Sequence, residues 1–103
     1  TRNSKVFDII SEFQNWGAKV VVSDPIADKD DVYSKNKITL ENLEEFEDLN
    51  AIIVAVGHQE IISLNLNNFK TYMNWDFKPV FADLKSLYNV NILDNLGYTV
   101  FRL

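Results

Sequence analysis

Cysteine is absent from this chain of 103 residues, and histidine occurs only once, at His58. The absence of cysteine excludes a disulfide framework, a thiolate metal site and a cysteine nucleophile within these residues, and it fits a reducing compartment. A single histidine has no histidine partner for a metal ion, and no Ser/His/Asp set shows a recognisable spacing. We therefore expect no metal site, and we expect the protein in the cytoplasm.

Glycine is scarce as well, and Gly17, Gly57 and Gly97 stand far apart. The sequence has neither G-x-G-x-x-G nor a P-loop, so these residues alone cannot cradle a dinucleotide in the usual way. No apolar run approaches the roughly 20 residues of a membrane span, and the first residues show no signal-like pattern. The net charge of -5 and the pI of about 4.7 leave no basic surface for nucleic acid or an anionic membrane. We expect neither as a partner.

Apolar residues are plentiful, at 47% of the chain, and 13% of the chain is aromatic. This content is ample for a packed core, so we expect one globular domain over residues 1–103. Hydrophobic spacing predicts helices over residues 4–16 and 64–73, and short helices are expected over residues 27–36, 40–49 and 89–97. Apolar runs predict strands over residues 18–24, 37–40, 51–57, 78–84 and 98–103.

The pattern of the strands indicates how they are arranged. Residues 51–57 carry no charge and do not alternate, which is typical of a parallel strand covered on both faces. Residues 18–24 predict a second buried strand, which ends at Asp24 because a proline follows. Strands that alternate with helices predict an α/β fold with a parallel sheet.

In such a sheet, ligands bind beyond the carboxyl ends of the strands. The strand exits carry Asp24, then Gly57 and His58, then Asp83 and Lys85. Asp24 either borders a site or simply caps a turn, and Lys85 either neutralises a phosphate or is an ordinary surface lysine. His58 fits a polar contact better than a general base, and Gly57 either admits a ligand close to the backbone or permits a tight turn.

The start of the first helix is another candidate site. Arg2 stands just before Ser4, the expected N-cap, where free amides and the helix dipole favour an anion. Arg2 is therefore either a phosphate ligand or a disordered terminal arginine. The acidic stretches 28–31 and 44–48 lack the spacing of a calcium loop and are read as solvated faces.

Four stretches in this order resemble the C-terminal, UDP-binding domain of the UDP-glucose/GDP-mannose dehydrogenase family. They read RNSKVFDIISEFQNWGAKVVVSDPIAD, LNAIIVAVGHQEI, PVFADLKSLYN and LGYTVFRL. The resemblance covers essentially the whole chain and is strongest for the bacterial branch that acts on UDP-N-acetylhexosamines for capsule and O-antigen precursors. It implies a three-layer α/β/α Rossmann-like domain with a mainly parallel sheet.

The resemblance also implies an activity for a larger enzyme. Members of this family oxidise the C6 hydroxymethyl group of a UDP-sugar to a carboxylate in two NAD-dependent steps, through a thiohemiacetal on a cysteine. Because this chain has no cysteine, the resemblance implies that the nucleophile lies in the rest of the dehydrogenase chain, which also binds most of the NAD. We expect these 103 residues to be inactive alone, and the full enzyme to be a homo-oligomer.

Residue roles follow from the family motifs. Arg2 matches the arginine of the D-x-R-x-S motif, which reaches the NAD pyrophosphate, and Ser4 matches its serine. Lys85 matches the basic residue of the D-x-[KR] motif, which contacts the UDP-sugar, and Asp83 matches its acidic partner. The family strand before this arginine, which ends in a substrate-contacting lysine, is not in the sequence. We therefore expect the first family strand to be missing from the sheet.

An alternative of a different class is a non-catalytic α/β interaction module or a receiver-like regulatory module. A receiver needs paired acids after its first strand and a lysine late in the fold, whereas residues 18–24 end in Asp24 alone. The two functions differ in their ligand. Only the dehydrogenase domain should prefer UDP to adenosine nucleotides.

Overall fold

The computed structural model of the protein describes residues 4–55, 57 and 66–102. The chain divides into two compact units, Thr1–Glu45 and Phe46–Leu103, which are described one at a time. The expectation of one domain over residues 1–103 stays a prediction. No helix in the described part of the chain is long and apolar enough to cross a membrane.

The first unit begins with α1, Ser4–Asn15, which confirms the expected amphipathic helix. Its end is closed by Gly17, whose φ is 89°. The Gly17 N–H donates to the Gln14 carbonyl at 3.0 Å, and the Ala18 N–H donates to the Phe13 carbonyl at 3.0 Å. These bonds satisfy two of the last helix carbonyls, and glycine takes the left-handed conformation without strain.

The buried strand expected over residues 18–24 is wrong. This segment forms a single parallel bridge, Val22 to Leu40, and is at most half-buried. The edge strand expected over residues 37–40 is reduced to the same bridge, because Lys37, with φ 58°, already serves as the C-cap of the helix before it. A strand is stable only when its backbone groups find ladder partners over several residues, and one bridge supplies too few.

Between these segments lies α2, Lys29–Asn36, which confirms the expected short polar helix. Its N-cap is Asp28, whose carboxylate accepts the Asp31 N–H at 2.9 Å. The helix expected over residues 40–49 is instead a single 3-10 turn, η1, Leu43–Glu45. The apolar residues of this segment keep a three-residue spacing, but the segment leaves the helical conformation at Asp48, whose φ is 55°. The Leu49 N–H then donates to the Tyr72 carbonyl and does not continue a helix.

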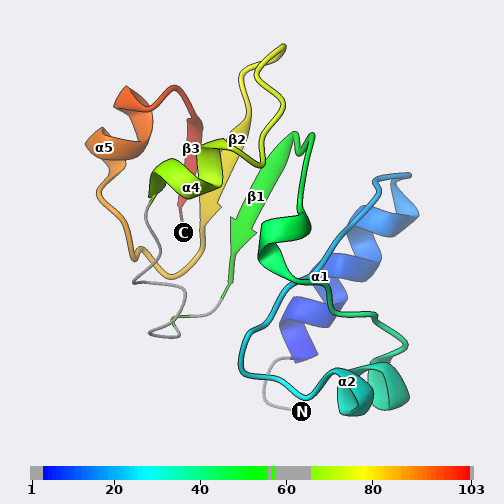
Figure 1. The fold of residues 1–103 in the computed structure, drawn as a ribbon. Coiled ribbons are helices and arrows are strands. Elements are labelled where there is room, and N and C mark those ends of the chain that lie inside the picture. The colour runs from blue at the N-terminus through cyan, green and yellow to red at the C-terminus, as the bar shows by residue number, and fades with distance from the viewer. Residues whose placement is uncertain (1–3, 56, 58–65, 103) are drawn as a thin grey trace. The chain divides into compact units, whose positions relative to one another are not determined.

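The second unit is built on a three-stranded parallel sheet with the order β1-β2-β3. Its strands are β1, Ala51–Val54, β2, Val80–Asp83, and β3, Thr99–Arg102. The crossovers carry α4, Leu66–Lys70, and α5, Val90–Asn95 (Figure 1). Parallel neighbours joined through helices define an α/β fold, so the structure confirms the Rossmann-like α/β class with a parallel sheet.

β1 is shorter and less covered than its sequence predicts. Ile52 and Val54 are buried, but Ile53 on the opposite face is 37% exposed. The expected cover on both faces is therefore wrong for this strand, which pairs only with β2 within the described sheet. The expected pattern appears on β2, where Phe81 and Ala82 point to opposite faces and are both buried.

The helix expected over residues 64–73 is present only as the five-residue α4. Leu64 lies outside the described residues. Tyr72 and Met73 lie past the helix, where the Leu49 N–H donates to the Tyr72 carbonyl at 2.9 Å. Because residues 72–73 bond to this neighbouring segment, they do not continue the helical pattern.

The centre of the core lies on β2. Phe81 is fully buried, and its ring meets those of Phe69, Tyr88 and Tyr98 edge-on at centroid distances of 5.9, 5.5 and 5.2 Å. Tyr98 follows Gly97, which ends α5 with φ 106° as predicted. A Cβ on this glycine would stand 3.1 Å from the indole of Trp75, so the position serves both the helix end and a close approach.

Candidate functional site at the carboxyl edge of the sheet

The register of the sheet aligns the ends of its three strands. Val54, Asp83 and Arg102 are paired across β1, β2 and β3, and each is the last residue of its strand. The segments that follow β1 and β2 therefore begin at one edge, the carboxyl edge. This is the place where open parallel sheets bind ligands.

Asp83 organises the loop that leaves β2. Its side chain has no exposed surface, and its two carboxylate oxygens accept the backbone N–H groups of Leu87 at 2.9 Å and Tyr88 at 2.8 Å. Its carbonyl accepts the Ser86 N–H at 3.3 Å. Hydrogen bonds to an ionised acceptor are short and strong, and they compensate the cost of burying the carboxylate.

Lys85 stands in this loop as an exposed residue, next to Ser86 in the left-handed conformation with φ 54°. In the described part of the chain, the one ion pair joins Lys35 to Asp31 within α2. The ammonium of Lys85 is therefore not neutralised by any described carboxylate. A lysine of this kind is available for an anionic ligand.

Gly57 lies beside the same loop. A Cβ built on it would stand 3.5 Å from the Cδ2 atom of Leu87, which is ordinary van der Waals contact. The structure thus brings together two positions that the sequence separates by about thirty residues, the exit of β1 and the loop after β2. The contact itself does not require glycine.

The hydroxyl of Tyr88 belongs to this loop as well. Burial, together with the nearby charge of Asp83, raises the pKa of Tyr88 above its usual value of 10.0. The phenol is therefore neutral at physiological pH and is a hydrogen-bonding group, not a base. Its ring packs edge-on against Phe81, which couples the loop to the core.

Asp24, in the first unit, caps a turn, and its predicted place at the edge of a site stays a prediction. Its carboxylate accepts the Ile26 N–H at 2.9 Å and the Ala27 N–H at 3.2 Å, which makes it the cap of a turn. Arg2 and His58 lie outside the described residues, and so does the side chain of Ser4, although α1 begins at Ser4. Their predicted roles stay predictions.

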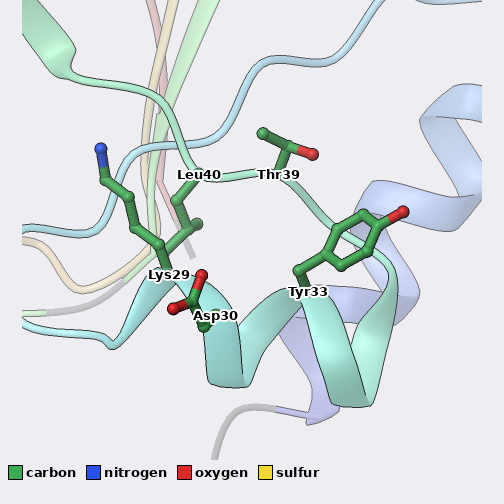
Figure 2. Close-up of a pocket in the computed structure, with 5 residues that line it drawn as sticks. All are labelled: Lys29, Asp30, Tyr33, Thr39 and Leu40. Atoms are coloured by element: carbon green, nitrogen blue, oxygen red, sulfur yellow. The ribbon is translucent and has the colours of Figure 1, made fainter.

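A hollow of about 350 Å³ lies elsewhere, within the first unit (Figure 2). It is lined by residues from α2 and the segment after it, Lys29, Asp30, Tyr33, Thr39 and Leu40. The Lys29 ammonium already donates to Asn42 at 3.1 Å, and the Tyr33 side chain is 54% exposed. The hollow offers little buried polar surface to a ligand, and no group of acids and histidines in the described residues could hold a metal ion.

Arg102 is a further cation at the carboxyl edge that sequence reasoning missed. It is exposed, and its pairing with Asp83 puts the two side chains on the same face of the sheet. The signal that could have found it is its place as the last polar residue of the final predicted strand.

Residues 1–90 match the UDP binding domain of the UDP-glucose/GDP-mannose dehydrogenase family. Protein CapL of Staphylococcus aureus is 32% identical over 104 residues, which cover 99% of this chain and 23% of CapL. UDP-N-acetyl-D-glucosamine 6-dehydrogenase of Salmonella typhi is 30% identical over 84 residues, which cover 82% of this chain and 19% of that enzyme.

No solved structure gives a significant match. The chain spans about a fifth to a quarter of the length of these relatives. The family match covers most of the chain, including β1, β2 and the loop after β2. The chain therefore belongs to the UDP-glucose/GDP-mannose dehydrogenase family and represents its UDP-binding domain.

Proposed function

We propose that this chain binds the UDP part of a UDP-hexose or UDP-N-acetylhexosamine for an NAD-dependent 6-dehydrogenase of polysaccharide biosynthesis. The observation that supports the proposal is Lys85, an exposed lysine that no described carboxylate neutralises, on an anchored loop at the carboxyl edge. The printed name of the Salmonella typhi relative supports an N-acetylhexosamine nucleotide as the substrate. The cytoplasmic location and the homo-oligomer stay predictions.

The proposed binding of UDP rests on the attraction between the positive charge of Lys85 and the negative charge of the diphosphate. A diphosphate carries negative charge on several oxygens. The lysine ammonium is a compact positive charge that attracts these oxygens and can donate hydrogen bonds to them. The loop is held by hydrogen bonds to Asp83, so little backbone conformational entropy is lost when Lys85 binds. Because Lys85 is exposed, its attraction is weakened by salt, and affinity should fall as ionic strength rises.

The family implies NAD for the full enzyme, but the described residues lack the features of a dinucleotide site. They contain no glycine-rich turn at a helix start, and Gly57 stands alone at its strand exit. These residues do not fit a dinucleotide site of their own. We propose that NAD is bound by the rest of the enzyme, with Arg2 as a contact, and that the chain alone forms no NADH.

Removing the charge of Lys85 tests the proposal. Lys85→Ala should weaken UDP binding to the chain by about 1–3 kcal/mol, the scale of a lost charge-assisted hydrogen bond. Isothermal titration calorimetry at low salt measures this change, and the full enzyme should show a higher KM for its UDP-sugar.

The matched control is Lys78→Ala, which removes the same charge from an exposed lysine just before β2, at the opposite end of the strand. This variant should bind UDP as the unmodified chain does. Equal affinities for both variants and the unmodified chain would exclude Lys85 as a ligand.

A further inference from the structure

Asp83 is a fully buried acid at the candidate site, and its hydrogen-bond partners among the described residues are backbone N–H groups. Both carboxylate oxygens already accept backbone N–H groups, those of Leu87 and Tyr88. No ion pair with a described cation neutralises it. Burying a carboxylate without an ion pair costs free energy, and in Asp83 this cost is offset by two hydrogen bonds that hold the loop after β2.

Those bonds fix the path of the chain around Lys85. The Leu84 N–H donates to the Val54 carbonyl at 3.1 Å, which extends the sheet by one bond past Asp83. The Ser86 N–H then donates to the Asp83 carbonyl at 3.3 Å, and the carboxylate holds the next two amides. Lys85 is the residue between these fixed points, and it is the one whose side chain is exposed and charged.

The conformation of Ser86 shows that this path has a cost. Its φ of 54° lies in the left-handed region, which disfavours a residue with a Cβ by about 1 kcal/mol. Such a conformation persists where surrounding contacts impose it. The nearest contacts that do so are the hydrogen bonds to Asp83 from Ser86 itself and from Leu87, the residue after it.

We propose that Asp83 is a positioning residue, which touches no ligand itself but holds the loop of residues 84–88 so that Lys85 is presented to a diphosphate. This inference rests on the proposed function for its ligand. It assigns the two residues of one motif different tasks: Lys85 supplies the charge, and Asp83 supplies the geometry.

A double-mutant cycle between the two residues tests this division. Asp83→Asn keeps the size of the side chain but turns one acceptor into a donor, which cannot accept the second amide. In the otherwise unmodified chain, Asp83→Asn should raise the dissociation constant for UDP about tenfold. In the Lys85→Ala background the same change should raise the dissociation constant less than about twofold, because the loop then carries no lysine whose position matters.

The control is Asp76→Asn, which makes the same chemical change at an exposed acid before β2. It should leave UDP binding unchanged in both backgrounds. An equal loss from Asp83→Asn with and without Lys85 would overturn the proposal, since Asp83 would then act independently of the lysine.

Amide hydrogen exchange supplies a second readout that needs no ligand. In the unmodified chain, the Leu87 and Tyr88 amides should be protected although they lie outside any helix or strand, and Asp83→Asn should reduce that protection. Unprotected amides in the unmodified chain would overturn the proposal even if the variant did not fold. Protected amides in a chain that fails to bind UDP would refute the proposed function, but the inference that Asp83 holds the loop would stand.

Discussion

Replacing Phe81 by alanine should lower the free energy of unfolding of the second unit by about 3–5 kcal/mol. The side chain is fully buried in the middle strand, and its ring is in contact with three other aromatic rings. Truncation removes the transfer free energy of the ring and leaves a cavity that β2, paired on both sides, cannot close. Urea denaturation followed by circular dichroism measures the loss.

The matched control is Phe77→Ala, because Phe77 lies just before the same strand and is 75% exposed. Its truncation should change the free energy of unfolding by no more than about 0.5 kcal/mol. Similar losses for the two variants would contradict the placement of Phe81 at the centre of the core. Since the ring also packs against Tyr88, Phe81→Ala should loosen the loop that carries Lys85.

Tyr98 should make the protein lose stability at alkaline pH. Its hydroxyl is buried without a hydrogen-bond partner in the described part of the chain, and burial raises the pKa of Tyr98 from 10.0 to about 12. Between these two values the unfolded chain has lost the proton and the folded chain retains it, so the free energy of unfolding falls as pH rises. Two pKa units correspond to about 3 kcal/mol, lost progressively from pH 10 to pH 12.

Tyr98→Phe isolates this contribution. At neutral pH the variant should be as stable as the unmodified protein, or more stable by about 1 kcal/mol, because an unsatisfied hydroxyl is removed. Its stability should then decline less steeply above pH 10. Tyr88, whose pKa is raised too, remains in both proteins, so the difference between their curves reports Tyr98 alone. Parallel curves would contradict the buried, unpartnered hydroxyl.

Much of the second unit could be predicted from local sequence. The uncharged run at residues 51–54 and the apolar run at residues 80–83 are recognisable because buried parallel strands lack alternation. The glycines at positions 17 and 97 mark helix ends because only glycine takes those φ values easily. The rule that ligands bind beyond the carboxyl ends of strands then identifies Lys85 and Gly57 as candidate site residues from the predicted strands alone.

The failures share one cause, which is that strand formation depends on partners that a local pattern does not contain. The segment 18–24 has the composition of a buried strand, yet it finds one bridge, at Val22. Ile53 stands in an uncharged run that predicts a strand buried on both faces, yet its side chain is exposed and β1 is at the edge of the described sheet. The hydrogen bonds of Asp83 are equally outside a local pattern, since its two amide donors follow it by four and five residues in an irregular loop.

The proposed place of UDP is the carboxyl edge of the sheet. Amide NMR spectra of the isotope-labelled chain, recorded during titration with UDP and separately with AMP, test this placement. We expect UDP to perturb Gly57 and residues 84–88 most strongly, and AMP to perturb them weakly. Perturbation confined to the hollow between Lys29 and Leu40, or equal effects of UDP and AMP, would contradict it.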